Sequence, residues 1–162
     1  MTISIGDTLP SAKLLKIGDG GPEYVSLDDK VKGRKVIIFG LPGAFTGTCT
    51  AAHVPSFIRT KPKFDAKGVD EIICISVNDP HVMRAWGEST GATAAGLTFL
   101  ADADSAFTGA IGMQFDAPAA GFHKRSIRYA MYVVDGKVQI LNVEEARGVC
   151  EMSSGETLLD QI

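Results

Sequence analysis

Residues 36–49 read Val36-Ile-Ile-Phe-Gly-Leu-Pro-Gly-Ala-Phe-Thr-Gly-Thr-Cys49: an apolar run, a Pro/Gly turn, then two threonines that lead to a cysteine. The apolar run predicts a buried strand, and the residues after the turn begin a helical pattern. Cys49 is therefore expected at a helix N-terminus, where unpaired N–H groups and the helix dipole favour an anion. Its thiol should ionise at a lower pH than a free cysteine, whose pKa is about 8.5. A nucleophilic thiolate is the leading functional hypothesis.

The length and composition of the chain predict one globular domain over residues 1–162. A chain of 162 residues with 45% hydrophobic content can bury roughly two thirds of its unfolded surface around one core. Sixteen basic against nineteen acidic residues give a net charge of -3, and no basic stripe follows the sequence. Nucleic acid is therefore not expected as a partner.

The location predicted from the sequence is the cytoplasm. No basic segment followed by an apolar stretch opens the chain, and no apolar run approaches the ~20 residues that span a bilayer, so no membrane partner is expected. The three cysteines, Cys49, Cys74 and Cys150, suit a reducing compartment better than a disulfide scaffold. No CxxC pair or His/Cys spacing suggests zinc.

Strand and helix patterns alternate along the chain. Apolar runs bounded by turn signals predict strands at 36–40, 71–77, 97–100, 127–134 and 137–142, the last two joined in a hairpin at Asp135-Gly136. Helical periodicity predicts helices at 48–67, 80–90, 104–111 and 153–162, the first broken near Pro55. Ser153 and Glu156 have capping-box spacing, so the last helix should begin there, with Cys150 in the loop before it. The pattern predicts an α/β fold.

The residues beside Cys49 raise it above an ordinary buried thiol. A lone cysteine is usually a small buried hydrophobe. Here Thr46 and Thr48 can each cap the helix, and the Thr46 hydroxyl could also donate to a thiolate one turn away.

The spacing Pro42-x-x-x-Thr46-x-x-Cys49 resembles the signature of the peroxiredoxins. Similarity to their type II subgroup extends over nearly the whole chain and is carried by residues 39–46, 53–57, 67–80 and 85–87. The resemblance implies a thioredoxin-like fold, with a central mixed sheet flanked by helices. It also implies reduction of hydrogen peroxide or alkyl hydroperoxides, with Cys49 as the peroxidatic residue.

The family's other site residues transfer to three positions. The resemblance implies that Pro42 shields the thiolate, that Thr46 hydrogen-bonds the sulfur and the attacked oxygen, and that Arg128 supplies the guanidinium. Lys124 and Arg125 are competitors for the last role by sequence position. Cleavage of an O–O bond needs an in-line nucleophile and donors near the departing oxygen, and backbone N–H groups of residues 43–49 add to those donors. The reaction yields a sulfenic acid and requires no metal, flavin or haem.

The expected substrate pocket combines the turn with apolar side chains. Phe45 and Phe122 could line a site for organic hydroperoxides, beside Gly43, Gly47 and Thr48 of the turn, or could equally form a core edge or a dimer contact. Gly47 stands where the subgroup usually has proline, which loosens the loop at a cost of about 0.4–1 kcal/mol. Activity is expected to survive this change.

His53 offers a rival chemistry. It follows Cys49 by four residues and so shares its helical face, as a Cys–His hydrolase would require. The sequence lacks the local signatures of cysteine proteases, and in the peroxiredoxin interpretation His53 is not the base. A non-catalytic thioredoxin-like binding module is a third alternative.

The other cysteines bear on how a sulfenic acid is reduced. Cys74 lies in an apolar strand and is expected to be structural. Cys150 resembles the resolving cysteine of animal members of the subgroup, whereas many plant and bacterial members lack it and use glutathione with glutaredoxin. Glutathione with glutaredoxin, or thioredoxin, is therefore the expected reductant. The resemblance also implies a homodimer.

Overall fold

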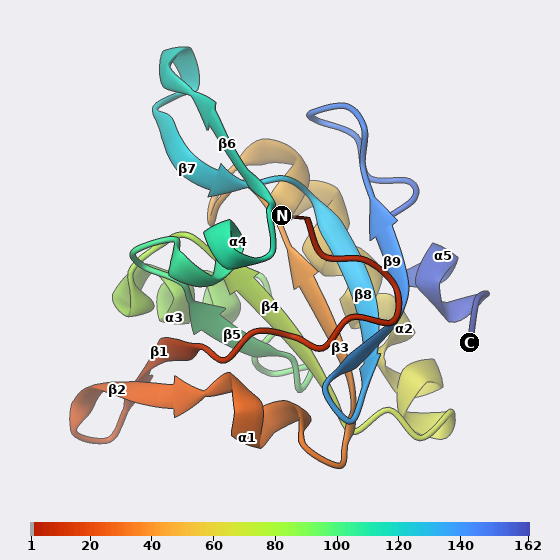
Figure 1. Cartoon of the computed structure of the whole chain (residues 1–162). Helices are drawn as coiled ribbons and strands as arrows, with labels where there is room; N and C mark the ends of the chain where they lie inside the picture. Colours follow the sequence, from red (N-terminus) through yellow and green to blue (C-terminus); the bar gives the residue numbers. More distant parts are fainter. Residues whose placement is uncertain (1) are drawn as a thin grey trace.

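The computed structural model describes residues 2–162 (Figure 1). Its helices are α1 Leu27–Val31, α2 Val54–Ala66, α3 Pro80–Ser89, α4 Ala106–Ala110 and α5 Gly155–Leu159, with a π-helical turn at Cys49–His53 and a 3-10 turn at Pro118–Ala120. Its strands are β1 Lys13–Gly18, β2 Gly21–Ser26, β3 Lys35–Gly40, β4 Glu71–Ser76, β5 Thr98–Ala101, β6 Gln114–Ala117, β7 Phe122–Ser126, β8 Tyr129–Val134 and β9 Lys137–Val143.

Seven strands form one mixed sheet in the order β2-β1-β5-β4-β3-β8-β9. The three central strands β3, β4 and β5 are parallel, and their outer neighbours run antiparallel to them. The predicted mixed sheet is thus confirmed, and all five predicted strands are present in it. The β1–β2 hairpin and the separate ribbon of β6 and β7 were not predicted.

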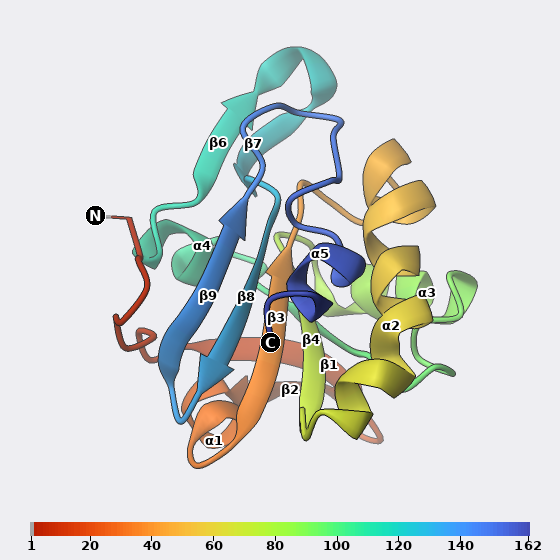
Figure 2. The ribbon, with the colours of Figure 1, turned by 90° about the vertical axis from the view of Figure 1, so that its right-hand side faces the viewer.

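Each face of the sheet is covered by its own set of helices (Figure 2). Side chains alternate along β3, so that Val36 and Ile38 join one buried cluster and Ile37 and Phe39 join the other. The first cluster includes residues of α1 and α4, and the second includes residues of α2, α3 and α5. Burial on both faces explains why β3 reads as a continuous apolar run.

The helix that follows Cys49 differs from the prediction at its proline. We expected a break near Pro55, but the chain stays helical and changes from a π turn to an α-helix between His53 and Val54. The Val54 N–H bonds the Cys49 carbonyl, five residues back. Pro55 has no N–H to give, which accommodates the wider turn immediately before it.

The last helix begins one residue later than its capping box predicts. Ser154, not Ser153, is the N-cap, and its hydroxyl accepts a hydrogen bond from the Thr157 N–H. Ser153 does not cap because its hydroxyl and its N–H both donate to the Glu144 carboxylate.

Register brings three distant segments to one end of the sheet. Gly40, the last residue of β3, pairs with Tyr129, the first residue of β8, and Tyr129 pairs in turn with Val143, the last residue of β9. The segments that follow β3, precede β8 and follow β9 therefore meet at this end. No helix within residues 2–162 combines the length and the apolar character that crossing a membrane requires.

Candidate active site

The structure places Arg128 beside Cys49. Cys49 opens the π turn and is 1% exposed, and Arg128, which directly precedes β8, is 5% exposed. The Arg128 Nη2 donates to the Cys49 Sγ at 3.4 Å. The guanidinium therefore supplies a buried, charged hydrogen-bond donor directly at the sulfur.

His53 holds the other side of the same guanidinium. The Arg128 Nη1 lies 3.1 Å from the His53 Nδ1, and the His53 Nε2 lies 3.0 Å from the Ser153 carbonyl oxygen. Because arginine only donates and a carbonyl only accepts, Nδ1 is the acceptor and Nε2 carries the proton. Burial, and then the charge of Arg128, lower the pKa of His53 to about 3, against a smaller raising effect of the bond to Ser153.

This arrangement argues against a Cys49–His53 hydrolase. Both ring nitrogens of His53 are engaged with other groups, and a histidine with a pKa of about 3 is a weak base near neutral pH. His53 instead fixes the orientation of Arg128.

The pKa of His53 predicts a pH-dependent stability. Between its usual pKa of 6.5 and about 3, the unfolded chain binds a proton that the folded protein does not. The free energy of unfolding should therefore fall as the pH falls from about 6.5, by at most ~1.4 kcal/mol per pH unit. The lowered pKa values of Glu71 and Glu144 add losses of the same sign only below about pH 5.

Urea unfolding from about pH 7 to about pH 5 isolates the contribution of His53. The variant His53→Gln keeps one donor and one acceptor but does not titrate, so its stability should change less over this range. Equal slopes in the two proteins would contradict the assigned protonation.

The threonines before Cys49 do not cap the helix, contrary to expectation. The Thr46 hydroxyl donates to the Gly43 carbonyl at 2.7 Å, and the Thr48 hydroxyl donates to the Gly148 carbonyl at 3.2 Å. Helical conformation already begins at Gly47, and Thr48 has helical angles (φ -66°, ψ -33°). A capping residue needs extended angles, so Thr48 is inside the helical run.

Arg125 supports the turn rather than the sulfur. Its Nη1 donates to the Pro42 carbonyl at 3.0 Å, and its guanidinium lies over the Phe122 ring, 5.3 Å from the centroid. A Cβ on Gly43 would collide with the same Nη1. The sequence placed Arg125 near the site, but no local signal indicated this contact.

The contact between Gly43 and Arg125 predicts a coupled pair of substitutions. Gly43→Ala should destabilise the protein by about 1 kcal/mol, because the end of the flexible Arg125 side chain must move and its hydrogen bond to the Pro42 carbonyl is lost. Most of this cost should disappear in an Arg125→Ala background, as urea unfolding of the four proteins would measure. Gly47→Ala is the control, since its Cβ would meet nothing within 4 Å. Additive effects of the two changes would contradict the contact.

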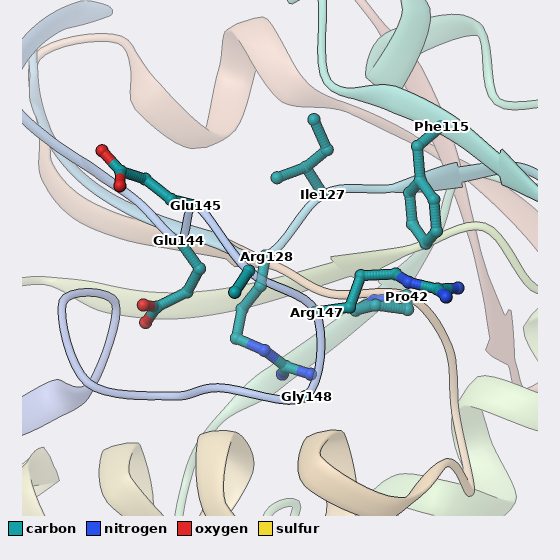
Figure 3. Close-up of a pocket in the computed structure, with 9 residues that line it drawn as sticks. Pro42, Phe115, Ile127, Arg128, Glu144, Glu145, Arg147 and Gly148 are labelled. Carbon is teal, nitrogen blue, oxygen red and sulfur yellow. The ribbon is translucent and has the colours of Figure 1, made fainter.

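Two adjoining pockets open at this end of the sheet. The larger, of about 350 Å³, is lined by Pro42, Thr46, Gly47, Thr48, Phe122, Arg128, Arg147 and Gly148. The smaller, of about 160 Å³, is shown in Figure 3 and is lined by Pro42, Phe115, Ile127, Arg128, Glu144, Glu145, Ala146, Arg147 and Gly148. The two share four residues, Arg128 among them, so they lie side by side.

The pocket lining agrees with the expected set only in part. Gly47, Thr48 and Phe122 line the larger pocket, whereas Gly43 and Phe45 line neither. Phe45 has a positive φ of 61° that turns it outward, where its side chain is 57% exposed and lies 6.5 Å from the Trp86 ring. Residues 144–148 were missed, because nothing in that loop indicates its approach to the turn.

The other two thiols lie in different surroundings. Cys74 is fully buried in β4, and burial raises the pKa of its thiol well above the usual value. Cys150 is half-buried in the loop between β9 and α5, and burial also raises the pKa of this thiol. All three cysteines are free thiols. Within residues 2–162, no three His, Cys, Asp or Glu side chains gather as metal ligands.

Comparisons with known proteins identify the family. The Redoxin family matches residues 4–159. Mitochondrial peroxiredoxin-2F of Arabidopsis thaliana is 47% identical over 136 residues, 84% of this chain and 67% of the relative. Peroxiredoxin-2C of Oryza sativa subsp. japonica is 40% identical over 158 residues, 97% of this chain and 96% of the relative. The crystal structure of reduced Prx3 from Vibrio vulnificus in complex with H2O2 superposes with a TM-score of 0.91 at 43% identity, covering 99% of each chain.

These matches span the mixed sheet, its flanking helices and the segments that meet over Arg128. They show a thioredoxin-like fold and the activity of a thiol peroxidase. The chain belongs to the Redoxin family and, within it, to the type II peroxiredoxins.

Proposed function

We propose that Cys49 is the peroxidatic residue of this thiol peroxidase. The observation that carries the proposal is the Arg128 Nη2 at 3.4 Å from the Cys49 Sγ, since Arg128 also lines a pocket together with Thr46. The thiolate sulfur attacks one peroxide oxygen, a S–O bond forms and the O–O bond breaks. The sulfur supplies the two electrons, and the departing oxygen leaves with the bonding pair and takes up a proton. The products are Cys49 sulfenic acid and water or an alcohol.

Thr46 acts in this proposal as an acceptor for the peroxide. Its O–H is directed to the Gly43 carbonyl, which leaves the lone pairs of its oxygen free to accept the peroxide O–H. Pro42 is buried and lines the same pocket, and in this proposal its apolar ring limits the access of water. The complex of Vibrio vulnificus Prx3 with H2O2 supports hydrogen peroxide as a substrate here.

We propose Cys150 as the resolving residue. Its half-buried thiol lies in the same loop as Gly148. The Gly148 carbonyl accepts a hydrogen bond from the hydroxyl of Thr48, the residue that directly precedes Cys49. Attack of the Cys150 thiol on the sulfenic acid forms a disulfide and releases water, and external thiols then reduce the disulfide. Thioredoxin, or glutathione with glutaredoxin, supplies those thiols.

Mass spectrometry after one equivalent of H2O2 tests both assignments. In Cys150→Ser, dimedone should label Cys49 alone, because the sulfenic acid then has no partner within the chain. In the unmodified protein a Cys49–Cys150 disulfide is expected. Labelling at Cys74 would contradict the first assignment, and a persistent sulfenic acid in the unmodified protein would contradict the second.

We further propose that residues 1–162 form one domain and act in the cytoplasm as a homodimer. The proposal of one domain is based on the length and composition of the chain, and the proposed cytoplasmic location is based on its few, unpaired cysteines. The dimer is supported by the exposed aromatic ring of Phe45 near the active-site turn. Sedimentation should show a dimer that Phe45→Ser weakens, and a monomer at all concentrations would contradict it.

A further inference from the structure

Arg147 occupies an unusual position at the mouth of the pocket. It lines both hollows, its side chain is exposed, and its Cζ lies 6.0 Å from the centroid of the Phe115 ring. Across residues 2–162 no carboxylate forms an ion pair with it, and none of its N–H groups donates a hydrogen bond. The guanidinium is held by an aromatic face and keeps its donors for another partner.

The neighbouring acids do not neutralise this arginine. Figure 3 shows the Arg147 guanidinium directed toward Phe115 and Pro42, while the side chains of Glu144 and Glu145 point to the opposite side. One Glu144 carboxylate oxygen is already engaged, since it accepts from the N–H groups of Glu151 and Ser153 at 2.9 and 2.8 Å. The mouth of the pocket is therefore positive on one side and acidic on the other.

The exposed surfaces inside the two hollows are mainly apolar. Pro42, Phe115 and Ile127 line the smaller hollow, and Phe122 lines the larger one. The larger hollow is also lined by Thr46 and Arg128, where the proposed function puts the peroxide. A molecule with a reactive group at one end, a short hydrocarbon stem and an anion at the other end would match these surfaces.

We propose that Arg147 forms a carboxylate-binding subsite of the active site, so that the enzyme favours ligands that carry a carboxylate. A guanidinium offers two parallel N–H donors that match the two carboxylate oxygens. The inference rests on the proposed function, because the same pocket must lead to Cys49. The carboxylate can belong to the hydroperoxide or to the reducing thiol, since both must reach the same sulfur.

The hydroperoxide arm of the test uses two substrates: an analogue of tert-butyl hydroperoxide in which one methyl group is replaced by CH2COOH, and the methyl ester of this acid. The unmodified enzyme should show a kcat/KM about 3- to 10-fold higher for the acid, and Arg147→Gln should remove this preference, because it deletes the charged donor. Arg147→Lys should keep part of it. Sodium chloride should weaken the preference, because this arginine is exposed.

The thiol arm compares mercaptopropionate with its methyl ester as reductants of the enzyme oxidised by H2O2. If Arg147→Gln loses the preference for the acid in this arm alone, the subsite binds the reductant. If it loses the preference in the hydroperoxide arm alone, the subsite binds the substrate. The control Arg84→Gln alters an exposed arginine on α3 and should change neither preference.

Three outcomes separate this inference from its foundation. If Arg147→Gln retains H2O2 reduction and both preferences persist or were never present, the subsite is overturned and the proposed function stands. If Arg147→Gln turns over the acid and the ester more slowly by the same factor, Arg147 only packs on Phe115, and the subsite is again overturned. If Cys49 is not oxidised by H2O2, the proposed function itself fails.

Discussion

Cys49→Ser is expected to reduce hydroperoxide consumption at least roughly a thousandfold, to the background of buffer and protein. A serine hydroxyl stays protonated at neutral pH and is a far weaker nucleophile, although it fits the space of the thiol. The Arg128 Nη2 would then face a neutral oxygen instead of an ionisable sulfur. The rate of H2O2 loss in stopped-flow measurements, with excess reductant, reports the change.

The other two thiols provide matched controls for this experiment. Cys74→Ser should leave the first oxidation step unaffected, because the Cys74 thiol is fully buried in β4 and its pKa is raised. Cys150→Ser should leave that step unaffected and slow only the reduction of the oxidised enzyme. Substantial peroxide consumption by Cys49→Ser would exclude Cys49 as the nucleophile.

Arg128→Ala is expected to lower the rate of Cys49 oxidation about 10²- to 10³-fold. The guanidinium is the charged donor at the sulfur, and loss of one such donor typically costs about 2.7–4 kcal/mol of transition-state stabilisation. Iodoacetamide alkylation of Cys49 at neutral pH should also slow, because the sulfur loses the guanidinium that donates to it. An unchanged alkylation profile would contradict the role given to Arg128.

The same substitution has a second, independent readout at His53. Arg128 is one of the causes that lower the pKa of His53, so its removal should raise that pKa. NMR titration of the imidazole would measure the shift. Arg128→Lys keeps a positive charge but not the two-pronged fork, so it should retain part of the alkylation behaviour while losing one of the two contacts.

The centre of the sheet was predictable because burial on both faces leaves a continuous apolar run, as in β3 and β4. The β1–β2 hairpin was missed because β2 contains Pro22 and has no fully buried residue, so it shows no apolar alternation. The β6–β7 ribbon was missed because its strands are short and their register shifts between Phe115 and Ala117. Short exposed strands depend on their pairing partner more than on their own residues.

The turn and the cysteine were predictable from local spacing, but their contacts were not. The hydroxyls of Thr46 and Thr48 find carbonyl partners, one of them 100 residues away, in place of the helix terminus. Arg147 reaches the pocket only because β9 ends opposite the start of β8. Such approaches follow from register, which single-sequence patterns do not encode.

The hydrogen bond between His53 and the Ser153 carbonyl connects two parts of the molecule that are 100 residues apart in the chain. Ser153 belongs to the segment that bears Cys150, while His53 steadies the guanidinium at the sulfur. Movement of that segment toward the proposed Cys49 sulfenic acid would remove the carbonyl that accepts from the His53 Nε2–H, and with it a restraint on the ring that holds Arg128. The segment that would supply the proposed resolving thiol thus also holds the imidazole beside Arg128, so reduction of the proposed sulfenic acid and orientation of the guanidinium are linked through one hydrogen bond.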